Sequence, residues 1–211
     1  LSKKLVDPDW KPDFGPAEFN KSVEKSGATG ISARDFLVAY NINLNTTSTR
    51  RANAVAFDIR EAGRIKREGG TLSGKIMKDK DGTPLKTPGL FKAVKGIGWF
   101  IEEYGVAQIS YNLTNINISP LHEVFDKTCE RALARGMRVT GSELVGLVPK
   151  KVLIDTGKYF LEKQKRSIGI PENDIITIAI KTLGLNELTE FKARKRIIEY
   201  LLEDTNVEVD E

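Results

Sequence analysis

Residues 94–114 form two runs in which apolar residues alternate with small or polar ones, on either side of a short turn. This period of two is typical of half-buried strands, and Gly105 suits a tight turn at Glu103–Gly105 because glycine readily takes a positive φ. The sequence therefore predicts a β-hairpin with one buried face. The residues expected on the buried face are Ile97, Trp99, Ile101, Ala107, Ile109, Tyr111 and Leu113.

The opposite face of this hairpin is expected to be flat and polar. Amide and hydroxyl side chains alternate there with glycines, which would let a ligand or a partner backbone approach closely. A merely solvated sheet face is the alternative. The residues expected on this face are Gly96, Gly98, Gln108, Ser110, Asn112 and Thr114.

An earlier strand predicts a matching surface. Alternation over Asp35–Leu44 directs one apolar set toward the core and a small, amide-rich set to the other side. The inward set is Phe36, Val38, Tyr40, Ile42 and Leu44, and the outward set is Leu37, Ala39, Asn41 and Asn43.

Two helices and a last strand complete the pattern. Ser48 is the expected N-cap of a helix with apolar residues at helical spacing. A second helix is expected between Pro120 and Gly136, followed by a strand at residues 138–145. The resulting order, β-α-β-β-α-β, predicts an α+β fold of the ferredoxin-like split type. Two helices would cover one face of its antiparallel sheet and leave the other free for a ligand or partner.

The remainder is expected to be helical. Helices are predicted at residues 150–165, 172–183 and 190–203 from their apolar spacing and their start and stop residues. An acidic tail follows from Asp204 and is expected to fray.

Residues 63–89 break the regular pattern. They carry seven Lys or Arg residues against three acidic ones, together with several glycines. Lys80–Thr83 has the composition of a hairpin turn. We expect a mobile, basic excursion and favour a solvated loop over an anion site.

Composition limits the function classes. The 211 residues are 40% hydrophobic and 29% charged, which suits one ordinary domain or two small ones. A net charge of +4 does not mark the whole chain as a polyanion binder. The single cysteine, Cys129, excludes an internal disulfide and is expected to be a buried small hydrophobe. No membrane-length apolar run or signal peptide is evident, so we expect a cytoplasmic location.

Residues 1–33 are expected to be a connector rather than a domain. The chain begins with Leu1 instead of methionine, as a piece of a longer protein would. Three prolines within Asp7–Pro16 predict a stiff, extended, non-helical backbone. Trp10 and Phe14 are unusual in a disordered linker, so we expect this segment to pack against something.

Candidate catalytic groups are scarce. His122 is the only histidine, and nothing in the sequence supplies a nucleophile for it to activate. We therefore expect it at the edge of a helix-packing stripe. The sequence also has no phosphate-binding glycine loop and no metal-ligand spacing. It predicts a binding surface without a catalytic group.

A non-catalytic RNA-binding module is the alternative. Residues 95–101 resemble the RNP1 signature of RNA-recognition motifs. Against this, Ile97 and Glu102 occupy positions where stacking aromatics belong. The signature also falls on the second strand rather than the third, and Trp99 is expected to be buried.

Several blocks spread over almost the whole chain carry a resemblance to a known family. They are Asp9–Pro16, Gly27–Gly30, Phe36–Leu44, Lys95–Trp99, Gly141–Pro149 and Arg196–Leu201. In this order they resemble the glutamate formiminotransferases.

The resemblance implies a specific activity and organisation. The family transfers a formimino group from N-formimino-L-glutamate, a product of histidine degradation, to N5 of the co-substrate tetrahydrofolate. Its transferase unit has two ferredoxin-like subdomains with folate in the groove between them. This chain resembles the second subdomain at residues 34–204, with the connector at residues 1–33 before it and the acidic tail at residues 205–211 after it.

The resemblance also implies what this chain lacks and where it binds. The family's catalytic histidine lies in the first subdomain, so the chain alone is expected to be inactive, with that subdomain or a second copy as its partner. The basic excursion is longer than in animal members, which leaves its role open, and no cyclodeaminase domain follows. The folate-lining stretch corresponds to Lys11, Pro12, Asp13, Phe14, Gly15, Pro16, Ala17, Glu18, Phe19 and Asn20.

Overall fold

The computed structural model describes residues 1–70 and 74–205. It divides into two units, Leu1–Arg34 and a larger one that begins at Asp35. The larger unit combines helices with an antiparallel sheet, so the fold belongs to the α+β class. Most of the expected acidic tail lies outside the described residues.

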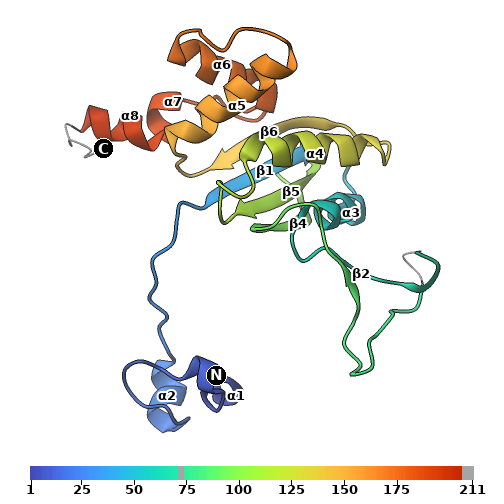
Figure 1. Ribbon diagram of the computed structural model, residues 1–211, viewed down its shortest axis with the longest axis vertical. Helices are drawn as coiled ribbons and strands as arrows, with labels where there is room; N and C mark the ends of the chain where they lie inside the picture. The colour runs from blue at the N-terminus through green and yellow to red at the C-terminus, as the bar shows by residue number, and fades with distance from the viewer. Residues whose placement is uncertain (71–73, 206–211) are drawn as a thin grey trace. The chain divides into compact units, whose positions relative to one another are not determined.

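A four-stranded antiparallel sheet forms the centre of the larger unit, with the spatial order β4-β5-β1-β6. Along the chain, these strands and two helices follow the expected order β-α-β-β-α-β. Both helices contribute to one core with the sheet (Figure 1). The elements are β1 (Val38–Leu44), α3 (Thr49–Ile59), β4 (Val94–Ile101), β5 (Val106–Leu113), α4 (Leu121–Leu133) and β6 (Val139–Val145).

Strand β5 has the expected face toward the core. Its four alternating apolar residues are fully buried. The Tyr111 hydroxyl lies 3.1 Å from the Thr128 hydroxyl of α4, which fixes the helix over this face. The buried residues of β5 are Ala107, Ile109, Tyr111 and Leu113.

Strand β4 has the opposite register from the one predicted. Gly96 pairs with Tyr111 and Gly98 with Ile109, so both glycines lie on the helix-covered face. Ile97 and Trp99 consequently lie on the other face, where 57% and 45% of their surface is exposed. Ile101, expected in the core, also lies on that face and is half-buried.

Close approach of α3 explains this register. A Cβ added to Gly98 would lie 2.7 Å from the Cβ of Ala52 and 2.4 Å from the backbone nitrogen of Asn53. Real Cβ atoms do not tolerate such contacts, so only glycine fits here. Phe36 was also expected to face the core, but it precedes β1 and is 61% exposed.

The helices after the sheet follow the prediction as far as residue 183. The expected helix at residues 190–203 is instead broken at Ile197, which is fully buried and extended. Val148 donates its N–H to the Arg196 carbonyl at 2.9 Å and accepts from the N–H of Ile198 at 3.1 Å. The elements are α5 (Lys150–Lys163), α6 (Glu172–Leu183), α7 (Ala193–Arg196) and α8 (Ile198–Asp204).

The segment that follows Ile197 also caps the N-terminus of α5. Pro149 precedes this helix and provides no side-chain cap. The Glu199 carboxylate accepts the N–H of Lys150 at 2.7 Å and satisfies one of the backbone donors left open at a helix start. An acidic group there also interacts favourably with the helix dipole.

The basic excursion forms a two-stranded arm rather than an irregular loop (Figure 1). Strands β2 (Arg64–Ile65) and β3 (Lys86–Thr87) pair at its base, and η2 (Glu68–Gly70) follows β2. The predicted turn is present near Lys80–Thr83. There, the Asp79 carboxylate accepts the backbone N–H groups of Asp81 at 3.0 Å and Thr83 at 2.8 Å.

The smaller unit is less extended than predicted. It contains α1 (Ser2–Leu5), a 3-10 turn η1 (Pro8–Trp10) and α2 (Lys21–Ser26). The prolines predicted a non-helical backbone, yet Pro8 begins the helical turn η1. Proline is compatible with this position, because the first residue of a helix does not need its N–H.

Candidate functional site

The ten predicted folate residues all lie in the smaller unit, between η1 and α2. Pro12 and Ala17 are half-buried, and the other eight are exposed. Asn20 has a structural role, because its side-chain oxygen accepts the N–H groups of Ser22 and Val23, each at 3.0 Å. It is therefore the N-cap of α2.

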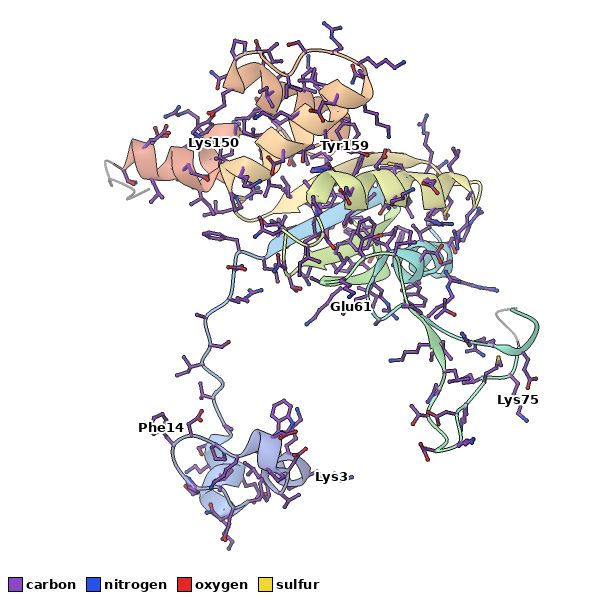
Figure 2. The ribbon with its side chains drawn as sticks, viewed as in Figure 1. Lys3, Phe14, Glu61, Lys75, Lys150 and Tyr159 are labelled. Atoms are coloured by element: carbon purple, nitrogen blue, oxygen red, sulfur yellow. The ribbon has the colours of Figure 1, made fainter. Side chains whose placement is uncertain are left out.

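Trp10, just before this segment, and Phe14, within it, behave differently. The Lys4 ammonium lies 3.5 Å from the centre of the Trp10 ring, a favourable cation–π contact. Phe14 is 94% exposed and points away from its unit (Figure 2), so it does not pack within that unit. Gly15 follows it with a φ of 84°, a conformation that favours glycine. The segment presents two exposed aromatic rings, Phe14 and the 45% exposed Phe19, on a proline-restricted backbone.

The second candidate surface is the sheet face opposite α3 and α4. Trp99 and Ile97 lie there beside polar residues of the neighbouring strands. Asn112 is exposed and Ser110 is half-buried, in line with an open polar face. Thr114, just after β5, is also half-buried. This surface combines apolar and hydrogen-bonding groups, as ligand and partner surfaces do.

Three other polar residues expected on this face are buried. Gln108 donates its amide N–H to Asn43 at 2.6 Å, and Asn43 donates in turn to the Glu187 carboxylate. Asn41 donates to Glu143 at 3.5 Å. The predicted side of the sheet is correct for all three, but the loop after α6 covers Asn43. Burial of such amides requires these hydrogen bonds.

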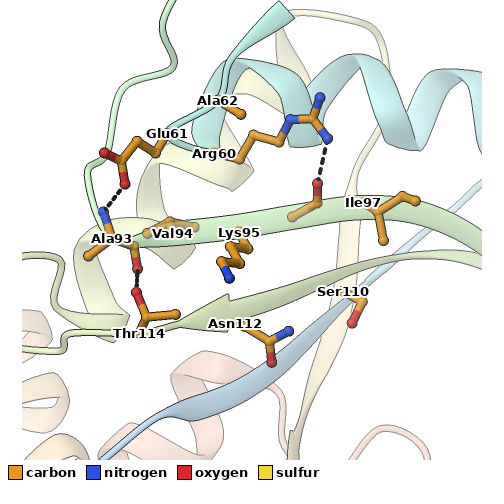
Figure 3. A pocket seen from close by; sticks show the side chains of 11 residues that line it. Arg60, Glu61, Ala62, Ala93, Val94, Lys95, Ile97, Ser110, Asn112 and Thr114 are labelled. Carbon is orange, nitrogen blue, oxygen red and sulfur yellow. Dashed lines mark hydrogen bonds between the residues drawn. The ribbon is translucent and has the colours of Figure 1, made fainter. Parts of the chain in front are cut away.

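A pocket of about 540 Å³ lies at the edge of β4 (Figure 3). Arg60, at the end of α3, donates to the Gly96 carbonyl at 3.1 Å. Burial lowers the pKa of this guanidinium. Lys95 provides a second positive charge in the wall. The volume is within the range of small-molecule sites, and the wall combines these two cations with the Glu61 carboxylate.

The same pocket contains a strained backbone position. Ala93 has a φ of 54°, which is unfavourable for a residue with a Cβ. Its N–H donates to the Glu61 carboxylate at 2.8 Å, and its carbonyl accepts from the backbone N–H and hydroxyl of Thr114 at 2.8 and 3.0 Å. These contacts hold the chain in this conformation at the entrance to β4.

Sequence reasoning missed the role of α3 in closing this sheet edge. The outward N–H and carbonyl of Gly98 bond to the Asn53 side chain at 3.0 and 2.8 Å. Arg60 likewise donates a hydrogen bond to the outward carbonyl of Gly96. The signal was the pair of glycines at alternate positions, which permits a helix to approach an edge strand.

His122 lies in helix packing, as predicted. Its ring stacks on Tyr159 of α5 at a centroid distance of 4.5 Å, and burial lowers its pKa. The Tyr159 hydroxyl donates to Asp126 at 3.0 Å. Cys129 is half-buried rather than fully buried, and its pKa is raised to about 11 by burial. Neither residue contributes to the two candidate surfaces.

The described residues lack two features that other protein classes have. They contain no cluster of three or more His, Cys, Asp or Glu side chains arranged to hold a metal ion. Within the same part of the chain, no helix has the length and apolar character needed to cross a bilayer.

Comparison with known proteins gives a consistent result. The family model described as "Formiminotransferase domain" matches residues 39–203. Formimidoyltransferase-cyclodeaminase of Gallus gallus is 42% identical over 203 residues, which are 96% of this chain and 33% of that protein. Glutamate formimidoyltransferase of Thermoplasma acidophilum is 36% identical over 162 residues, covering 77% of this chain and 44% of that protein. The chain thus spans about a third of the length of the first of these relatives.

The RNA-binding alternative gains no support from these matches. Exposure of Trp99 removes one objection to it. The other two remain, because Ile97 and Glu102 replace the stacking aromatics and β4 is the second strand of the main sheet along the chain. The match over residues 39–203 and the similarity to two kinds of formimidoyltransferase lead to one assignment. The chain belongs to the formiminotransferase family.

Proposed function

We propose that this chain is the folate-side half of a glutamate formimidoyltransferase. The whole enzyme would transfer a formimino group from N-formimino-L-glutamate to N5 of tetrahydrofolate, during histidine degradation in the cytoplasm. The observation that carries this proposal is the family match over residues 39–203, together with relatives named for this transfer. The relatives' greater length leaves room for the other half.

The sheet order supports a ferredoxin-like second subdomain. Strands β4-β5-β1-β6 are antiparallel, and α3 and α4 connect them as in a split β-α-β-β-α-β sandwich. The half-exposed Trp99 and Ile97 on the open sheet face favour a cover by the first subdomain, with a second copy of the chain as the other candidate. A cover would bury apolar surface that now contacts water.

The connector is the proposed folate-binding segment. Its prolines restrict the backbone before a ligand arrives, which lowers the entropy lost on binding. Phe14 is exposed and can lie against the pterin or benzoyl ring of tetrahydrofolate, a contact worth about 1 kcal/mol. Lys11 is also exposed and would attract the glutamate carboxylates with a smaller contribution.

The proposed reaction needs general acid–base catalysis, because protons move as the amidine changes amines. The only histidine of this sequence, His122, is stacked between helices. As the family resemblance implies, we assign the catalytic group to the first subdomain. The role of this chain is to bind and orient the co-substrate.

Two substitutions in the full-length enzyme test the folate assignment. Phe14→Ala and Lys11→Ala should raise the Kd for tetrahydrofolate, about fivefold for Phe14→Ala and less for Lys11→Ala, with almost no change in melting temperature. Phe36→Ala is a matched control, since Phe36 is also an exposed aromatic but lies in the larger unit. Loss of stability with unchanged folate affinity would mean that the connector is only a structural link.

A further inference from the structure

The arm and α3 line a second cavity, whose lining residues all belong to the larger unit. We call it the arm groove. Its volume is about 510 Å³, large enough for a small organic molecule. It is lined by Phe57, Arg60, Arg64, Ile65, Lys66, Arg67, Gly70, Met77 and Thr87.

The lining has a strong positive bias. Four of its side chains are cationic and none is acidic. Arg64 pairs with Asp58, a carboxylate that also pairs with Arg135. Arg67 instead donates to a neutral acceptor, the Gly74 carbonyl, at 2.9 Å. Lys66 forms no ion pair within the described residues.

Arg60 adds a third uncompensated charge. Its donors bond to the carbonyl oxygens of Gly63 and Gly96, each at 3.1 Å, so its orientation is fixed but its charge is not neutralised. Partial burial of the guanidinium also lowers its pKa. An anion in the groove would interact favourably with three positive groups at once.

The groove also has an apolar wall. The Arg60 guanidinium lies 4.0 Å from the centre of the Phe57 ring, which places aromatic and cationic surfaces together. Ile65 and Met77, from opposite sides of the arm, are exposed apolar side chains in the same lining. Inorganic ions alone would leave this wall in contact with water. An apolar body that carries a negative group would use both surfaces.

We propose that the arm groove binds an amphipathic organic anion, with a carboxylate or phosphate beside Arg60, Lys66 and Arg67 and a ring or short aliphatic body against Met77 and Ile65. The contacts that support this site do not depend on the proposed transferase role. The basic excursion, which was expected to be a solvated loop, would then form one wall of a ligand site.

Calorimetric titration with defined probes tests this site. The probes are naphthalene-2-carboxylate and 2-naphthyl phosphate, with acetate and inorganic phosphate as ring-free counterparts. Saturable binding of either naphthyl probe, at least tenfold tighter than its counterpart, is expected. Whichever naphthyl probe binds more tightly identifies the preferred acidic group.

Matched variants separate the groove from general attraction to a basic arm. Lys66→Gln/Arg67→Gln should weaken naphthyl binding about tenfold, since it removes two groove cations. Lys78→Gln/Lys80→Gln removes the same charge outside the lining and should change binding less than twofold. Met77→Ala, which alters no charge, should weaken the naphthyl probes and leave inorganic phosphate unaffected.

Three results would overturn the proposal. They are the absence of saturable binding by every probe, equal losses in the two charge variants, and binding of inorganic phosphate as tight as that of naphthyl phosphate. Amide NMR shifts of the wild-type arm and of each variant would verify that the arm remains folded. Met77→Ala still tests the site if the double variant loses arm structure.

Discussion

Gly98 of β4 lies against Ala52 of α3 so closely that an added Cβ would come within 2.7 Å of the alanine Cβ. This contact determines which face of β4 is covered. It also brings the Asn53 side chain within hydrogen-bond distance of the strand edge.

Gly98→Ala should lower the free energy of unfolding by about 1–3 kcal/mol, because the methyl group must displace the backbone of α3. Denaturant unfolding measures this loss. Gly30→Ala is the control, since Gly30 has no atom within 4 Å of an added Cβ. A Gly98→Ala protein as stable as the wild type would contradict the close helix approach.

Asn53→Ala should lower the free energy of unfolding by about 1–3 kcal/mol, because both outward backbone groups of Gly98 lose their partner. It should also promote concentration-dependent self-association, since an unpaired strand edge can pair with another chain. Sedimentation velocity and denaturant unfolding measure the two effects. The exposed Asn173→Ala should change neither by a comparable amount; unchanged behaviour of Asn53→Ala would exclude the edge-closing role.

Ala93→Gly should raise the free energy of unfolding by about 0.5–1 kcal/mol, because glycine removes the strain of a positive φ. Ala134→Gly provides a control of opposite sign, since Ala134 is exposed with an ordinary φ of −58°. Thermal and denaturant unfolding measure both. A destabilised Ala93→Gly protein would mean that the methyl group contributes more packing energy than the strain costs.

His122 should make stability depend on pH. Burial lowers its folded pKa below the unfolded value of 6.5, so the unfolded state binds more protons between the two values. Stability linked to His122 is therefore complete above pH 6.5 and falls as pH decreases through the folded pKa. The slope from one such group does not exceed about 1.4 kcal/mol per pH unit.

His122→Phe keeps a ring against Tyr159 but cannot titrate. Unfolding measured between pH 7.5 and 5 should show a smaller decrease for this variant than for the wild type. Nearby charges on both helices, from Glu123, Asp126, Lys151 and Asp155, remain in both proteins and provide a common background. Identical pH profiles would exclude the linkage to His122.

The chain alone should show no turnover of N-formimino-L-glutamate with tetrahydrofolate, because we assign the catalytic group to the other half. A coupled spectrophotometric assay measures this, with the full-length enzyme as the positive control. Measurable turnover by the isolated chain would show that the catalytic group lies within these 211 residues.

Local patterns predicted most of the sheet correctly. Side-chain alternation identified the inward face of β5 because Ile109 and Tyr111 are large and apolar. The same rule failed for β4, where glycines occupy the buried positions and Trp99 occupies the open face. Glycine has no side chain that records burial, so close packing against α3 was not visible in the pattern.

Long-range contacts account for the remaining differences between the sequence-based prediction and the structure. Residues 190–203 have helical spacing, yet the pairing of Ile197 with Val148 breaks the helix. No local signal reports a partner so far away in sequence. The candidate sites show the same limit, because Lys95 and the arm cations were visible as charges but their association with Arg60 depends on the fold.

The cap that Glu199 provides for Lys150 has a consequence for biosynthesis. The capping carboxylate is 49 residues downstream of the helix start, so α5 leaves the ribosome well before its cap. During that interval, the first turn of α5 has water as the partner for this N–H. This cap therefore forms only after Glu199 has been synthesised, so the start of α5 is completed late in the folding of this region.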